Sequence, residues 1–189
     1  MEKPKKKIVW IVTVIVIVVV IIIAVIVYKK SEQKKAIENA LKSDEPATTG
    51  PAFKPEPGKN RAVRNNNPFN LRLTSLAWTG KVPKAQNTDG QFEQFYEKKF
   101  GVRAGIKNII TQVVRKQKDT IDSLIKVYAP PVENDTTRYI QLVSEWTGIA
   151  PDVKFEPSKD NILKISGAIA RKEGATLTDA ELNEAYALI

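Results

Sequence analysis

The most apolar stretch of the chain lies near its N-terminus. From residue 8 to residue 28 the sequence reads IVWIVTVIVIVVVIIIAVIVY, twenty-one residues without a charged side chain. A helix of this length measures roughly 31 Å, which matches a hydrocarbon core of about 30 Å. Trp10 and Tyr28 stand near its two ends, where amphipathic rings favour the lipid headgroups. The pattern predicts one transmembrane helix over residues 8–28.

Two other interpretations fit this stretch less well. A cleaved signal peptide has an apolar core of about 7–15 residues followed by small residues, whereas this stretch is longer and runs directly into two lysines. A buried strand is suggested by the many Val and Ile residues, but strands are usually about 3–10 residues long. Lysines flank the stretch on both sides, so the positive-inside rule does not give its orientation.

The segments around the apolar stretch differ in composition. Residues 1–7 form a basic flank, and residues 29–42 predict a short helical extension with one apolar face. Residues 43–60 contain four prolines and two glycines, which is typical of a linker. We therefore expect residues 61–189 to form one soluble domain.

The pattern of the soluble domain changes near residue 101. Residues 61–96 are rich in Asn, Gly and Pro, and predict loops with one or two short strands. Beyond them, apolar residues recur at helical spacing. The expected helices run from Gly101 to near Lys118, from Thr120 to Pro130, from Asn134 or Asp135 to Gly148, from Ser158 to Gly174, and from Thr178 to the last residues. The expected fold is mainly α, of the α+β type, with a small irregular or β lobe.

The absence of Cys and His excludes several kinds of chemistry. No disulfide, thiolate nucleophile, zinc site of the His/Cys type or Ser-His-Asp triad can form. We also expect no cofactor and no metal, because the chain lacks a Walker loop, a dinucleotide fingerprint and an EF-hand loop. The net charge of +9 suits an anionic polymer, but no basic-aromatic cluster favours nucleic acid.

An asparagine-rich segment opens the soluble domain. Residues 64–72 read RNNNPFNLR, and three asparagines before a proline are typical of a structural turn. The alternative is that these side chains line a groove and bind hydroxyl, acetamido or carboxylate groups of a ligand. The candidates for such binding are Asn66, Asn67, Asn70 and Arg72.

Two further segments carry candidate binding residues. Trp78 stands in a polar loop beside a glycine, where it is either a core residue or a platform for the apolar face of a sugar ring. Residues 128–140 read YAPPVENDTTRYI, and Asn134 and Tyr139 are the candidates for ligand binding within them.

Glu133 is the first candidate for a catalytic acid. It lies between a proline stop and a helix N-terminus, where it either complements the helix dipole or acts as a general acid whose pKa is raised by apolar neighbours. Glycoside hydrolysis usually takes two carboxylates. Glu93, beside aromatic residues, is a weaker candidate for the second.

Six short motifs follow one another over residues 61–150. They are Asn66-Asn67-Pro68-Phe69-Asn70-Leu71-Arg72, Trp78-Thr79-Gly80, Phe92 with Phe95, Gly101-Val102-Arg103-Ala104, Tyr128 through Thr136, and Tyr139-Ile140 with Val143. Their order resembles a bacteriophage family of virion-associated peptidoglycan hydrolases and lytic transglycosylases with lysozyme-like domains. The chain departs from that family at Phe69, where Gly is usual, and it has a linker where lysozyme-like enzymes have the helix that supplies the acid. The resemblance implies association with the bacterial cell wall.

Three functions follow from these observations, in decreasing order of preference. The first is a single-pass, membrane-anchored phage virion protein that cleaves peptidoglycan glycan strands during genome entry, as a muramidase or a lytic transglycosylase. Its partners would be peptidoglycan, the lipid membrane and other virion proteins, with the soluble domain facing the cell wall. The second is a non-catalytic structural or wall-binding protein of the virion. The third is a membrane-tethered nucleic-acid binder.

Overall fold

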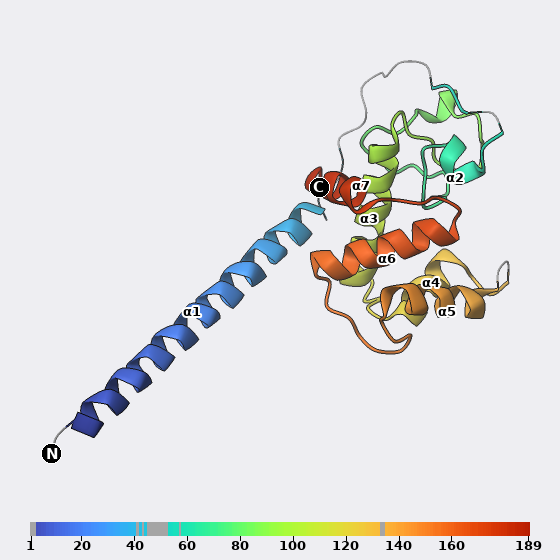
Figure 1. Cartoon of the computed structure of the whole chain (residues 1–189). Coiled ribbons are helices and arrows are strands. Elements are labelled where there is room, and N and C mark those ends of the chain that lie inside the picture. Colours follow the sequence, from blue (N-terminus) through green and yellow to red (C-terminus); the bar gives the residue numbers. More distant parts are fainter. Residues whose placement is uncertain (1–2, 41, 43, 45–52, 57, 133–134) are drawn as a thin grey trace. The chain divides into compact units, whose positions relative to one another are not determined.

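The computed structural model describes residues 3–40, 42, 44, 53–56, 58–132 and 135–189. The chain divides into two compact units, Met1–Glu38 and Asn39–Ile189 (Figure 1). We call the second unit the head. The boundaries predicted at residues 43 and 60 stay predictions.

The first unit is formed by helix α1 (Lys3–Ala40), drawn in blue in Figure 1. Its side chains from Val9 to Tyr28 are exposed. Between Val9 and Asn39 the helix is long and apolar enough to cross a membrane, judged by length and composition, and an 18-residue window within it has a mean hydropathy of 3.6. The expected apolar N-terminal helix is therefore confirmed, and its place in a membrane is taken up as a proposal.

The head is mainly helical, as expected. Its elements are α2 (Arg61–Arg64), η1 (Lys84–Gln86), α3 (Lys98–Arg115), α4 (Ile121–Tyr128), α5 (Thr136–Thr147), α6 (Lys159–Lys172) and α7 (Asp179–Ala187). The expected β lobe is reduced to two isolated antiparallel bridges among the described residues, one joining Arg72 to Phe92 and one joining Lys81 to Phe95. The segment before α3 is thus held together mostly by loop hydrogen bonds rather than by a sheet.

Short-range capping signals mark where helices α4, α5, α6 and α7 begin. Each cap accepts a hydrogen bond from a backbone N–H of the first turn, which would otherwise have no partner. In α4 and α7 a side chain of the first turn also bonds back to the cap, which completes a capping box. The capping residues are Thr120, Asp135, Ser158 and Thr178.

Two boundaries and one element differ from the expectation. Helix α3 begins at Lys98, before the apolar period starts, and Lys98 pairs with Glu181 of α7 at 2.7 Å. Helix α6 ends at Lys172, with Glu173 as its C-cap. The short helix α2 was expected as a loop, since four residues are too few to show a helical period.

Helix α3 lies at the centre of the head, in contact with α4, α6 and α7. Its isoleucines are fully buried, as are those that α4 and α6 turn toward the interior. Gly101 and Gly105 let the asparagine-rich segment lie directly on α3. A Cβ on Gly101 would stand 1.8 Å from the Asn66 carbonyl oxygen, and one on Gly105 would stand 1.9 Å from the Phe69 ring. This close packing places the segment beside the C-terminal end of α6.

Candidate functional site

A cleft of about 730 Å³ opens in the head, lined from α2, the asparagine-rich segment, α3, α4 and the residue that follows α6. Its polar lining residues are Arg61, Asn70, Arg72, Asn108, Gln112, Tyr128 and Glu173. Its apolar lining residues are Phe69, Leu71, Phe92, Val127 and Pro130. Amides, cations and aromatic rings thus surround one carboxylate among the described lining residues.

The Glu173 carboxylate is held in place through both of its oxygens. The Asn70 amide donates to Oε2 at 2.8 Å, and the Tyr139 hydroxyl donates to Oε1 at 2.9 Å. These donors come from segments 103 and 34 residues away in the sequence, respectively. Because one donor fixes each oxygen, the carboxylate has a defined orientation at the edge of the cleft.

The position of Glu173 at the end of a helix is electrostatically unusual. The last carbonyls of a helix carry partial negative charge, so cations rather than carboxylates are favoured there. The Asn70 and Tyr139 donors offset this cost. Gly174 turns the chain at a φ of 90°, and the Asn60 amide donates to its carbonyl oxygen at 2.7 Å, which anchors the turn. A carboxylate placed against the helix dipole and held by two donors suggests a role beyond packing.

Two phenols, of the buried Tyr139 and the half-buried Tyr128, stand beside the carboxylate. Burial, followed by the charge of Glu173, raises the pKa of both Tyr128 and Tyr139 above the ordinary value. Both hydroxyls therefore remain protonated donors at neutral pH. Tyr139 donates to Glu173, while Tyr128 donates to Asn108 Oδ1 at 2.9 Å.

Two arginines form a cationic wall of the cleft. The guanidinium carbons of Arg61 and Arg72 lie 4.6 and 5.1 Å from the centroid of the Phe92 ring. Arg61 also pairs with the buried Asp89 at 3.3 Å. Burial alone raises the pKa of Asp89, but hydrogen bonds from Asn65 and Arg64 outweigh it and hold that pKa below its usual range. The wall can therefore meet a carboxylate of a ligand with guanidinium groups.

Asn70 carries an acceptor that the described residues leave unused. Its Oδ1 atom is buried and receives no hydrogen bond from them. The backbone at Asn70 adopts a φ of 45°, in the left-handed region that Asn tolerates better than most residues. A buried polar atom without a partner calls for an explanation.

The other asparagines that the sequence singled out serve the turn. Asn67 is fully buried and donates to the carbonyls of Leu71 and Glu93, each at 3.0 Å. Asn66 has a φ of 50° and donates to the Phe95 carbonyl at 3.0 Å. These contacts support the structural-turn interpretation, and a role for either residue in ligand binding stays a prediction.

Glu93 and Trp78 lie outside the lining of the cleft. Glu93 is fully buried, pairs with Lys81 at 2.9 Å and accepts from the backbone N–H of Thr74, also at 2.9 Å. Trp78 is partly exposed, and its backbone N–H donates to the carbonyl of Leu76. Their suggested catalytic and sugar-binding roles stay predictions.

The structure brings three of the predicted residues to the cleft and leaves two undescribed. Asn70 and Arg72 line the cleft, and the buried Tyr139 supports Glu173 from behind it. Glu133 and Asn134 lie outside the described residues. Within the described ranges, no group of three or more Asp and Glu side chains gathers as a metal site would require.

Glu173 is the residue that the sequence reasoning missed. Its signal was present as a carboxylate directly before the glycine that ends a helix, a position where a basic residue is expected. The pairing with Asn70 depends on folding across 103 residues and could not be seen along the sequence.

Comparison with known proteins gives one similar relative and no matching family model. The chain is 36% identical over 98 residues to Protein P5 of Pseudoalteromonas phage PM2. The aligned region covers 50% of this chain and 60% of Protein P5. The chain is therefore similar, over half its length, to a bacteriophage protein.

Proposed function

We propose that this chain is a membrane-anchored bacteriophage virion protein whose head cleaves the glycan strands of peptidoglycan at the Glu173 cleft. The observation that carries the proposal is the Glu173 carboxylate, oriented by Asn70 and Tyr139 at the edge of an open cleft. The similarity to a protein of phage PM2 supports the phage origin.

The lining of the cleft suits an amino sugar polymer. Amides such as Asn108 and Gln112 can bond hydroxyl and acetamido groups, and the partly exposed ring of Phe92 offers apolar surface to a sugar ring. Arg61 and Arg72 suit the carboxylates that the wall polymer carries on its lactyl and peptide groups. The volume of about 730 Å³ lies within the range usual for ligand sites.

Glu173 acts first as an acid and then as a base. The Glu173 carboxyl group gives a proton to the glycosidic oxygen, and the bond from that oxygen to the anomeric carbon breaks. The resulting carboxylate then takes a proton from the hydroxyl group that attacks the anomeric carbon. That hydroxyl belongs to water in a muramidase and to the sugar itself in a lytic transglycosylase. A single carboxylate in the described lining favours the second route, and Glu133 remains the candidate for a second carboxylate.

Wall cleavage through the peptide stem fits this chain less well. The zinc amidases and the Cys/His peptidases depend on His or Cys ligands and nucleophiles, and the chain has neither residue. Carboxylate chemistry on the sugar linkage is what its side chains can supply.

Helix α1 is the proposed anchor. It is long and apolar enough to span a bilayer, and lysines on both sides of its apolar stretch suit the headgroup regions. The anchor would hold the head in the envelope, facing the cell wall, while the genome enters the cell.

The alternative is a head that binds the wall or another virion protein without cutting it. The buried hydrogen bonds of Asn66 and Asn67 favour this second candidate, because they show that part of the asparagine-rich motif serves the fold. Binding to cell walls without release of products would select it.

The test applies the full chain, held in detergent micelles, to gels that contain purified bacterial walls. The measured quantity is the clearing of the gel as the walls are degraded. The wild type should clear the gel, and Glu173→Gln should lower clearing at least 100-fold, the low end for loss of a general acid. Glu145→Gln, a matched change at an exposed position on α5, should clear like the wild type. If Glu133→Gln is inactive and Glu173→Gln is fully active, then Glu133 rather than Glu173 is the general acid.

A further inference from the structure

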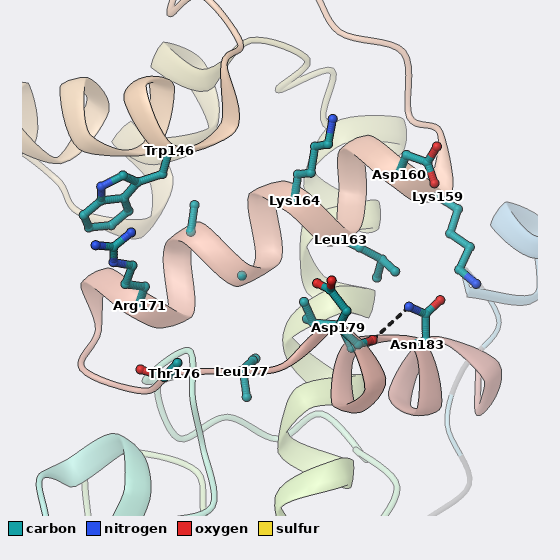
Figure 2. A pocket seen from close by; sticks show the side chains of 13 residues that line it. Trp146, Lys159, Asp160, Leu163, Lys164, Arg171, Thr176, Leu177, Asp179 and Asn183 are labelled. Carbon is teal, nitrogen blue, oxygen red and sulfur yellow. Dashed lines mark hydrogen bonds between the residues drawn. The ribbon is translucent and has the colours of Figure 1, made fainter.

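A second hollow, of about 620 Å³, lies between α5, α6 and α7 (Figure 2). We call it the Arg171 groove. Trp146 of α5 and Arg171 of α6 face each other at one end of it, and Lys164 projects from the same helix further along. None of its lining residues lines the Glu173 cleft. The groove is thus a separate feature of the head.

An aromatic ring and two cations give the groove its chemistry. The Arg171 guanidinium carbon lies 4.0 Å from the centroid of the Trp146 ring. Lys164 and Arg171 are seven residues apart in α6, about two turns, so they lie on the same face of the helix. This arrangement places an aromatic ring, with one cation stacked on it, near a second positive charge further along the helix.

A glycine leaves the floor of the groove bare. Gly167 lies between Lys164 and Arg171 in the interior of α6, where glycine destabilises a helix relative to alanine. A Cβ at this position would meet the Leu182 side chain at 3.4 Å, an ordinary contact. Packing therefore does not require glycine here. The absence of a side chain lets a ligand approach the helix backbone closely.

The charges of the groove favour a sugar polymer over a phosphate polymer. Two carboxylates, Asp160 and Asp179, line it together with Lys159, Lys164 and Arg171, which gives a net charge of +1. Nucleic acid carries a charge on every unit and is bound by surfaces with a larger positive excess. Carboxylates repel phosphates, but they accept hydrogen bonds from sugar hydroxyls.

We infer that the Arg171 groove binds a carboxylate-bearing glycan, with the sugar ring beside Trp146 and its carboxylate on Arg171 and Lys164. The identification of that glycan as peptidoglycan rests on the proposed function. The groove then holds the wall polymer at a second place, apart from the cleft where it is cut. Such a contact keeps the head on an insoluble substrate between cleavage events.

The test measures binding of the full chain in lipid nanodiscs to insoluble peptidoglycan sacculi by co-sedimentation. All proteins carry Glu173→Gln, so the result does not depend on cleavage by the wild type. Lys164→Ala with Arg171→Ala should weaken binding at least tenfold, and Gly167→Ala should weaken it severalfold while the head stays folded. The matched control joins Lys116→Ala and Lys126→Ala, two exposed lysines outside both hollows, and should bind within twofold of the parent.

Two further arms separate the ligand chemistries. Amidation of the sacculus carboxylates should remove the difference between the groove variant and the control. Equal binding of the groove variant and the control to untreated sacculi would overturn the inference. A different result would overturn the inference in favour of a phosphate polymer: single-stranded DNA binds, this binding depends on Lys164 and Arg171, and it falls steeply with salt. In that case binding to sacculi would not depend on these two residues.

Discussion

Asp44 lies in the segment that the sequence predicts as a linker, where a substitution is expected to cost little stability. Replacement of Asp44 by asparagine should nevertheless lower the free energy of unfolding of the head. The Asp44 side chain is 2% exposed and pairs with Arg103 at 2.8 Å and with Lys107, whose side chains are 9% and 7% exposed. Arg103 also donates from Nε to the Leu188 carbonyl at 2.9 Å, which ties the group to the C-terminal residues. One carboxylate thus balances two nearly buried cations on α3.

The cost of the change follows from the two cations left behind. Breaking a buried ion pair by removing one partner costs about 3–5 kcal/mol, because the remaining charge is desolvated without compensation. Detachment of the segment around Asp44 would let Arg103 and Lys107 regain water, so we expect a value near the low end. A loss of about 3 kcal/mol lowers the Tm of a domain of this size by roughly 6–12 °C.

Thermal unfolding of the full chain in detergent, followed by tryptophan fluorescence, measures this loss. Trp78 and Trp146 report on the head. Asp152→Asn, at an exposed position after α5, is the matched control and should leave the Tm within about 2 °C of the wild type. Lys107→Met combined with Asp44→Asn should cost less than the sum of the single changes, because the double variant leaves one cation rather than two. A Tm for Asp44→Asn equal to that of the control would refute the reasoning.

Three other predictions concern the fold, its response to pH and the anchor. Gly167→Ala should raise the free energy of unfolding of the head by about 1 kcal/mol, because alanine favours a helix more than glycine does. Denaturant titrations measure this gain, which is expected although the same change weakens binding at the Arg171 groove. A destabilised variant would show that packing requires the glycine. Acid should destabilise the head. Burial alone raises the pKa of Asp44, but hydrogen bonds from Arg103 and Lys107 outweigh it and hold the pKa below its usual range. The stabilisation by Asp44 is complete above about pH 4 and is lost as the pH falls through the lowered pKa that Asp44 has in the folded state. The Tm difference between wild type and Asp44→Asn should therefore shrink toward pH 3. A constant difference would contradict this prediction. Finally, the full chain should stay with membranes after extraction at alkaline pH, whereas a chain with Ile17→Arg and Ile21→Arg should be released.

Local signals carried most of the fold prediction. A long uncharged run identifies an apolar helix without reference to the rest of the chain, and caps such as Thr120 and Thr178 mark helix starts within four residues. The sequence pattern missed the short helix α2, because four residues show no helical period, and the early start of α3, because Lys98 lies before the apolar period. Lys98 pairs with Glu181, and Asn60 caps α2 while it also bonds Gly174.

The site was predicted less completely, for a physical reason. The sequence indicated Asn70, Arg72 and Tyr139, which lie in polar or motif-like segments. It did not indicate their common partner, because the place of Glu173 before a helix-ending glycine does not show which side chains fold onto it. Only folding brings Asn70 and Tyr139 to its two oxygens. Conversely, Asn67 lies in the same segment as Asn70 but turns inward to bond the backbone.

Mass spectrometry of the products released from purified peptidoglycan tests the central claim most directly. The full chain should release disaccharide-peptide fragments with a newly formed glycan end, and Glu173→Gln should release at least 100-fold less at an unchanged Tm. A 1,6-anhydro end would assign lytic transglycosylase chemistry, and a reducing end would assign hydrolysis. Equal release by the wild type and Glu173→Gln, or no release by the wild type while it binds the wall, would contradict the account.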